Sequence, residues 1–238
     1  MRVLYPGSMS SAEFSDFGAN VLGLALAALV LFGYYIYLAW RTRRDPTYSV
    51  RAVAQLARAS WVEFIMSRPG QDVLAVQTLR NSTMAATFLA STAVLLMIGV
   101  LTLTQYADRL GEAWGALSPV AATSRELWLI KLLCLLADLF FVFFCFSVAI
   151  RLLNQIGFMI AVPEALRHPG ASPRVVARHL NRAGDFYARG MRGYYFLIPL
   201  VFWLFGPLFL VISSVGLVLV LYWLDRGPKI GESEEIPD

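Results

Sequence analysis

Hydrophobic residues concentrate in four long stretches of the chain, and polar residues fall largely between them. An α-helix needs about 20 apolar residues to cross roughly 30 Å of hydrocarbon, and each stretch has that length. Only Lys131 and Asp138, both in the third stretch, introduce a charge. The pattern therefore predicts an all-α fold, a polytopic membrane four-helix bundle. Its predicted spans are residues 21–40, 83–103, 127–149 and 194–224, within a membrane domain of residues 21–225.

The connections between these stretches differ in their arginine content. Residues 41–80 and residues 151–193 contain seven arginines each, whereas residues 104–126 contain two. Because excess lysine and arginine marks cytoplasmic loops, the first and third connections are predicted to be cytoplasmic. Both termini then lie outside the cytoplasm, as an extracytoplasmic segment, 1–20, and an acidic extracytoplasmic tail, 226–238. This arrangement predicts a multi-pass protein of the plasma (inner) membrane.

Both basic connections show helical periodicity. The polar side chains of Arg51, Gln55 and Arg58 fall on one side of a helix predicted over residues 47–67, and apolar side chains fall on the other. Such a basic amphipathic helix lies in the headgroup layer or packs under the bundle as a cytoplasmic cap, and the sequence leaves both open. In the third connection, residues 174–189 show a second basic helical pattern.

Proline and small residues add detail to the predicted spans. Pro199 and the pair Gly206 and Pro207 predict a kink or a break in the fourth span, because proline removes a backbone donor and clashes one turn back. Small residues four positions apart let membrane helices approach closely. They predict contact faces at Gly23 and Ala27, at Ala86 and Ala90, and at Thr87 and Ser91.

Asp138 lies near the middle of the third stretch, where a carboxylate is costly and needs polar partners or a proton. Lys131 leans toward the N-terminal end of the same helix, so it is predicted to snorkel to the outer surface. Counting inward along the neighbouring spans predicts a midplane polar cluster. Its function stays open between a structural cluster that joins helices and a proton or ion relay. The predicted members are Asp138, Ser91, Thr92, Ser213 and Ser214.

The predicted topology brings a second set of polar residues to one level at the cytoplasmic face. The second span begins there, the third ends there and the fourth begins there. Converging arginines with amide and phenol groups suit the anionic headgroup of a lipid or another phosphate. The other interpretation is that each residue flanks its own span and faces phospholipid separately. The predicted headgroup site comprises Arg80, Asn81, Arg151, Asn154, Arg192 and Tyr195.

Short motifs stand at the ends of the predicted spans. They are QTLRNSTMAAT at residues 77–87, RLLN at 151–154, GMRGYYF at 190–196 and, beyond Pro199, WLFGP at 203–207. In order and spacing they resemble a widespread family of membrane proteins, catalogued as domain of unknown function 599, over roughly residues 20–225. The resemblance implies a four-span bundle and supplies no activity, substrate or cofactor. It singles out the same six residues of the predicted headgroup site.

Motifs that carry chemistry are scarce in this sequence. There is no paired acidic motif, nucleophile elbow or glycine-rich phosphate loop. His168 and His179 have no cysteine or carboxylate at metal-ligand spacing. Only 15% of the residues are charged and 58% are hydrophobic, which leaves little room for a soluble catalytic domain. The sequence therefore predicts a protein that is not an enzyme and uses no metal and no cofactor.

Three classes of function remain for such a protein, and the lack of catalytic motifs ranks an intramembrane enzyme last of the three. The preferred hypothesis is a non-catalytic structural, assembly or lipid-binding accessory subunit, working in a homo-oligomer or in a larger membrane complex. Its predicted partners are membrane lipids, anionic on the cytoplasmic side, and other membrane subunits, with no nucleic acid. The alternative is an oligomeric channel or a proton- or ion-coupled transporter that uses Asp138. Four helices rarely enclose a pathway alone, so the alternative requires several copies of the chain.

Overall fold

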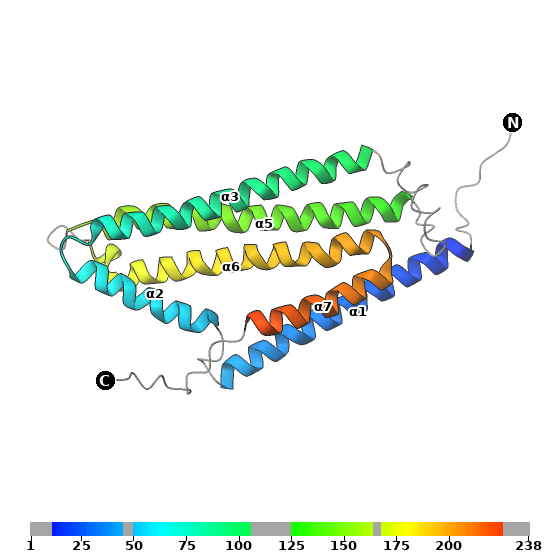
Figure 1. The fold of residues 1–238 in the computed structure, drawn as a ribbon, viewed down its shortest axis with the longest axis horizontal. Coiled ribbons are helices and arrows are strands. Elements are labelled where there is room, and N and C mark those ends of the chain that lie inside the picture. Colours follow the sequence, from blue (N-terminus) through cyan, green and yellow to red (C-terminus); the bar gives the residue numbers. More distant parts are fainter. Residues whose placement is uncertain (1–10, 45–49, 106–124, 164–167, 226–238) are drawn as a thin grey trace, which may run out of the picture.

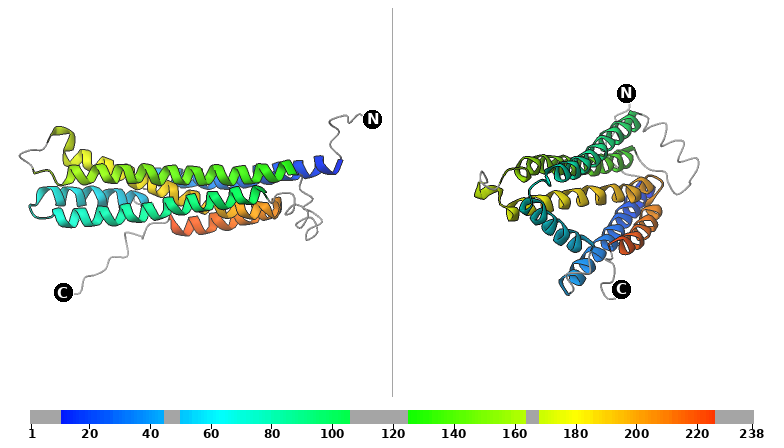
Figure 2. Two further views of the ribbon diagram at one scale, coloured as in Figure 1. Left: turned by 90° about the horizontal axis from the view of Figure 1, so that it is seen from above. Right: turned by 60° about the vertical axis from the view of Figure 1, so that its left-hand side comes forward.

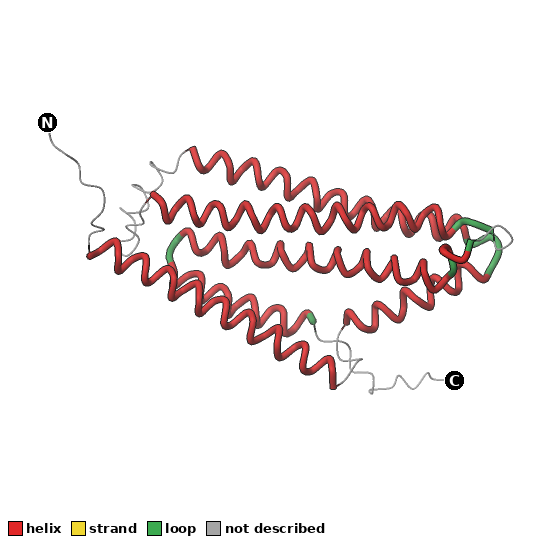
Figure 3. Tube along the Cα trace, turned by 180° about the vertical axis from the view of Figure 1, so that it is seen from behind, coloured by secondary structure: helices red, strands yellow, loops and turns green. Residues whose placement is uncertain are grey.

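The computed structural model describes residues 11–44, 50–105, 125–163 and 168–225, and these residues form helices without a strand (Figure 1). Short loops separate α2 from α3 and α6 from α7 (Figure 3). The predicted all-α polytopic fold is confirmed. The helices are α1 (Ser11–Arg44), α2 (Val50–Ser67), α3 (Asp72–Gln105), α5 (Arg125–Ile160), the short 3-10 helix η2 (Pro169–Ala171), α6 (Pro173–Leu204) and α7 (Pro207–Leu224).

Four of these helices, α1, α3, α5 and α7, are long and apolar enough to cross a membrane. Helices α3 and α5 contain 34 and 36 residues. At 1.5 Å per residue each is about 50 Å long, whereas the hydrocarbon core is about 30 Å thick. Both helices therefore extend about 20 Å beyond a bilayer core. Figure 2 shows the resulting elongated bundle from above.

Helices α3, α5 and α6 pack side by side as one layer (Figure 1). Gly190 of α6 lies directly against the ring of Phe146, and Gly193 lies directly against Val142, so small residues bring α6 close to α5. On α3, the predicted contact face of Ala86 and Ala90 is buried against the same two α5 side chains. The other small pair on α3, Thr87 and Ser91, is exposed.

The fourth apolar stretch is two helices instead of one span. Helix α6 ends at Leu204, the chain reverses, and α7 runs back from Pro207. Gly206 makes this reversal with φ +141° and ψ 163°, a region that only glycine adopts readily, and Pro207 suits the first position of a helix. The predicted single span over residues 194–224 is therefore wrong. The predicted break occurs at Gly206 and Pro207, while Pro199 lies within an unbroken α6.

The reversal changes where the ends of the helices lie. Helix α7 runs parallel to α1, because Gly23 touches Pro207 at the start of α7, and Tyr34, further along α1, donates to Asp225 just after the end of α7. Helix α1 therefore begins at one end of the bundle, and α7 runs toward the other end but finishes partway along it, beside Arg192 of α6 (Figure 1). The predicted topology has one span over residues 194–224, whereas the turn at Gly206 gives the chain a further pass along the bundle. Which end is cytoplasmic stays a prediction, and the segments 1–10 and 226–238 lie outside the described residues.

We call the half of the bundle where α3 and α6 begin and α5 finishes the basic end, and α7 finishes within this half, beside Arg192 of α6 (Figure 1). Helix α2 packs there against α6, and its Val62, Ile65 and Met66 are buried in a core shared with α3, α5 and α6. Its polar side, with Arg51 and Arg58, faces α6. Helix α2 is thus part of the bundle at this end. The second basic pattern, over residues 174–189, forms the first half of α6.

Candidate functional site

A groove opens at the basic end between α2, α3, α6 and α7, and we call it the basic groove. Its volume is about 720 Å³. Arg51 and Arg58 come to it from α2, and Arg192 comes from α6. Most of its wall is apolar, with Leu153 and Met191 among the lining side chains. The groove therefore combines guanidinium groups with a hydrophobic floor.

The structure brings together half of the predicted headgroup site. Asn81 lines the basic groove from α3, and Tyr195 lines it from α6 beside Arg192. Arg80, Arg151 and Asn154 are exposed and are not among the described residues that line the groove. On α5 the two neighbouring leucines between Arg151 and Asn154 face the core, so these polar residues point away from it.

On the α2 side of the basic groove, polar side chains of α2 bind residues of α6 that the sequence analysis did not predict as their partners. Arg51 forms an ion pair with Asp185 of α6, with 2.9 Å between its Nη2 and the carboxylate Oδ1. Gln55 Nε2 donates to the same oxygen at 3.2 Å. Arg58 Nε donates to Asn181 Oδ1 at 2.9 Å. The periodicity of residues 47–67 had placed these α2 side chains on one face, but it gave no sign that α6 would receive them.

Arg58 differs from the other two arginines of the groove. No carboxylate of the described residues forms an ion pair with it. Its guanidinium lies over Gly184, where a Cβ atom would come within 2.8 Å of Cζ. Partial burial lowers the pKa of Arg58, while Asp185 acts against this shift and Arg51 adds to it. A guanidinium stays protonated in proteins, so Arg58 brings a charge to the groove that no direct partner neutralises.

Arg192 stands at the boundary between the basic groove and a second cavity. Its Nη2 donates to Asp225 Oδ1 at 3.0 Å, and Tyr34 donates its hydroxyl to Asp225 Oδ2 at 2.8 Å. The guanidinium also lies over the Tyr35 ring, with 5.3 Å between Cζ and the ring centroid. One side chain thus connects α6 to the end of α7 and to α1.

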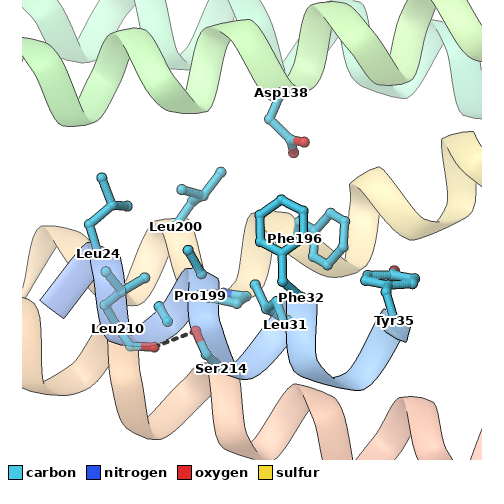
Figure 4. A pocket seen from close by; sticks show the side chains of 12 residues that line it. Leu24, Leu31, Phe32, Tyr35, Asp138, Phe196, Pro199, Leu200, Leu210 and Ser214 are labelled. Atoms are coloured by element: carbon cyan, nitrogen blue, oxygen red, sulfur yellow. Dashed lines mark hydrogen bonds between the residues drawn. The ribbon is translucent and has the colours of Figure 1, made fainter. Parts of the chain in front are cut away.

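The second cavity, which we call the Asp138 cavity, has a volume of about 440 Å³ and lies between α5, α6 and the α1–α7 pair. Figure 4 shows Asp138 reaching from α5 toward Phe196, with Ser214 on the far wall. The carboxylate Oδ2 is buried and has no hydrogen-bond partner among the described residues. Apolar side chains, including Leu31 and Leu200, make up most of the remaining wall.

The predicted midplane polar cluster does not form. Ser214 shares the cavity with Asp138, but its hydroxyl donates to the Leu210 carbonyl of its own helix at 2.7 Å. Ser213 likewise donates to backbone carbonyls of α7. Ser91 and Thr92 are exposed on α3, and Thr92 donates to the Phe88 carbonyl. The prediction failed because Asp138 faces α1, α6 and α7, and serine and threonine hydroxyls satisfy themselves within their own helices.

Lys131 does not snorkel to the outer surface. Its side chain is only 1% exposed, and its Nζ lies 5.7 Å from the centroid of the Trp203 ring. Trp203 Nε1 donates to Asn20 Oδ1 of α1 at 3.0 Å. The lean of Lys131 along its helix was a sound expectation, but α6 and α1 cover this face of α5. Trp203 of α6 supplies the cation–ring contact, so the packing of α6 against α5 is what covers Lys131.

The described residues contain no group of three or more histidine, cysteine or acidic side chains that could hold a metal ion. His168 Nδ1 accepts a hydrogen bond from the Gly170 amide at 3.1 Å. A ring nitrogen of His179 lies 2.9 Å from the Val175 carbonyl. Both histidines therefore take part in local backbone interactions.

The fold and its two cavities define a polytopic helical membrane protein with a basic groove at one end. Residues 22–229 match the model of the family described as "Protein of unknown function, DUF599", so the chain belongs to that family. The resemblance inferred from the motifs is thereby confirmed. Neither a curated protein nor a solved structure matches this chain.

Proposed function

We propose that this protein is a non-catalytic, lipid-binding component of its membrane, and that the basic groove holds the anionic headgroup of a phospholipid. The observation that carries the proposal is the charge of the groove. Arg51, Arg58 and Arg192 line it, while Asp185 and Asp225 pair with the first and the last of these. Three guanidinium groups against two carboxylates leave a net positive charge, which is centred on Arg58.

The size and lining of the groove support an amphiphile. A volume of about 720 Å³ is within the range of small-molecule sites in proteins. Asn81 and Tyr195 add donors that suit phosphate oxygens, and Leu153 and Met191 add apolar wall for the upper acyl chain. Arg192 and Asp225 lie where the apolar helix α7 finishes, so the groove begins at headgroup depth.

We further propose that the protein works as a homo-oligomer or as an accessory subunit of a larger membrane complex at the plasma membrane. Thr87 and Ser91, small residues four positions apart, are exposed on the outer face of α3. This spacing suits close approach by another membrane helix. Native mass spectrometry in mild detergent reports the number of copies and any co-purifying subunit. A monomer without partners would contradict this part of the proposal.

Retained lipid provides the direct test of the groove. We expect native mass spectra of the wild type to show bound anionic phospholipid, and we expect Arg58→Gln to weaken its binding by about tenfold, the loss of one charge-assisted contact. Arg178→Gln removes an exposed arginine of α6 that does not line the groove, so it is the matched control. Equal lipid retention in the two variants, or no lipid on the wild type, would refute the proposed site.

A proton- or ion-coupled transporter is the second candidate, and one observation favours it. The Asp138 carboxylate lies in a cavity with no hydrogen-bond partner among the described residues. Unpaired ionisable groups at membrane depth often mark ion or proton pathways. Proteoliposomes would test this function by proton-coupled uptake, which Asp138→Asn should abolish. Uptake that is unchanged in this variant would exclude a transporter that uses Asp138.

A further inference from the structure

We propose that the Asp138 cavity binds a hydrophobic organic cation, whose charge lies at the Asp138 carboxylate and whose apolar body fills the space between the helices. The cavity is an independent site from the basic groove, since Tyr35 and Arg192 stand between them. Its walls come from four helices, and Asp138 and the phenol of Tyr35 are the ionisable side chains among its described lining residues.

The surrounding charges leave the carboxylate without compensation. On α5, Lys131 is seven residues away, about 10 Å along the helix, and lies against Trp203 outside the cavity lining. From α6, Arg192 lies over the Tyr35 ring and pairs with Asp225. From α1 comes the Tyr35 phenol, and from α7 the polar lining residue is Ser214. An isolated carboxylate in apolar surroundings is costly, so either a proton or a bound cation must neutralise it.

The lining selects an organic cation over a metal ion. Hard cations such as Ca²⁺ and Mg²⁺ need six or more oxygen ligands. Among the described lining residues, only Asp138, Ser214 and the phenol of Tyr35 have side-chain oxygens, which is too few. Phe32, Tyr35 and Phe196 instead offer aromatic rings, which attract cations through their faces. A volume of about 440 Å³ accommodates a compact drug-sized molecule.

The experiment uses tetraphenylphosphonium as the probe and the full chain in nanodiscs of neutral phosphatidylcholine, so that anionic lipid does not attract the cation. Equilibrium dialysis should show saturable binding to the wild type above that of empty nanodiscs. Asp138→Asn, which keeps the size of the side chain, should weaken binding by about tenfold or more. Glu63→Gln, which removes an exposed carboxylate of α2 outside both cavities, should bind as the wild type does.

Two further measurements separate the site from an effect on folding. Because protons compete for the same carboxylate, wild-type binding should weaken as the pH falls, and the residual binding of Asp138→Asn should not. Ala28 lines the cavity from α1, so Ala28→Phe should fill the space and reduce binding while keeping the carboxylate. The proposal is overturned if the wild type binds no more probe than empty nanodiscs do. Unchanged binding in Asp138→Asn or in Ala28→Phe would also overturn it.

Discussion

The layer of α3, α5 and α6 and the pair of α1 and α7 are held together in different ways. Within the layer, glycine and alanine bring the helices together, as where Gly193 of α6 touches Val142 of α5. The α1–α7 pair is joined to that layer by the turn at Gly206 and by two side-chain hydrogen bonds, from Trp203 to Asn20 and from Arg192 to Asp225. In the layer, the small residues let the helices touch along their length. Between the layer and the α1–α7 pair, the polar contacts lie on either side of the Asp138 cavity, and the helices between them stay apart.

Gly193→Val is the strongest way to disrupt the tight layer. Its side chain would overlap Cγ2 of Val142, which is fully buried, so α6 would have to move away from α5. Overpacking of this kind costs about 1–3 kcal/mol, and we expect a fall in the free energy of unfolding at the upper end of this range in mixed detergent micelles. Gly99→Val on α3 is the control, since nothing lies within 4 Å of a Cβ added there. Similar losses in both variants would mean that α5 and α6 are not closely packed.

Gly206→Ala tests the junction between the layer and the pair. At φ +141° and ψ 163° an alanine is strained by about 1–3 kcal/mol, so we expect a lower free energy of unfolding. Gly216→Ala, within α7 and with open space around it, should be neutral or stabilising by up to about 1 kcal/mol. Thermal unfolding in mild detergent compares the two. If Gly206→Ala is as stable as Gly216→Ala, the reversal between α6 and α7 is not the structure of this segment.

A double-mutant cycle with Arg192→Gln and Asp225→Asn measures the contact that holds the α1–α7 pair at the basic end. The two side chains are about one quarter exposed, at 25% and 21%. Pairs of this kind contribute about 0.5–2 kcal/mol, so we expect a coupling energy in that range. The coupling should shrink as salt is added, because water reaches both groups. Strict additivity of the two changes would show that the pair is not joined to α6 here.

The sequence predicted the first three apolar helices, because length and composition decide whether a helix can span a bilayer. It also predicted two contact faces, Gly23 with Ala27 on α1 and Ala86 with Ala90 on α3. It also placed Asn81, Arg192 and Tyr195 at one level, and all three line the basic groove. It could not predict the reversal after α6. Residues 194–224 contain no charge, so the hydrophobicity of the stretch does not distinguish a kinked helix from two helices joined by a tight turn.

The sequence also could not predict which residues the charged side chains bind, because these partners are distant in the chain. Arg58 and Asn181 are 123 residues apart, and Arg192 and Asp225 meet only because α7 runs back along α6. Lys131 shows the same dependence, since its burial follows from the cover that α6 provides. Local spacing indicates which face of a helix a side chain occupies. It does not indicate which distant element lies against that face.

The length of α3 and α5 has a practical consequence for imaging. A lipid disc or detergent belt would hide the parts of these helices at hydrocarbon depth, but about 20 Å of each would stand clear of it. Helix α2 braces that exposed portion through the buried core around Val62 and Ile65. Single-particle electron microscopy of so small a protein needs a rigid feature outside the belt for alignment. The ends of α3 and α5 that pack against α2 provide such a feature, and an antibody fragment could bind to them.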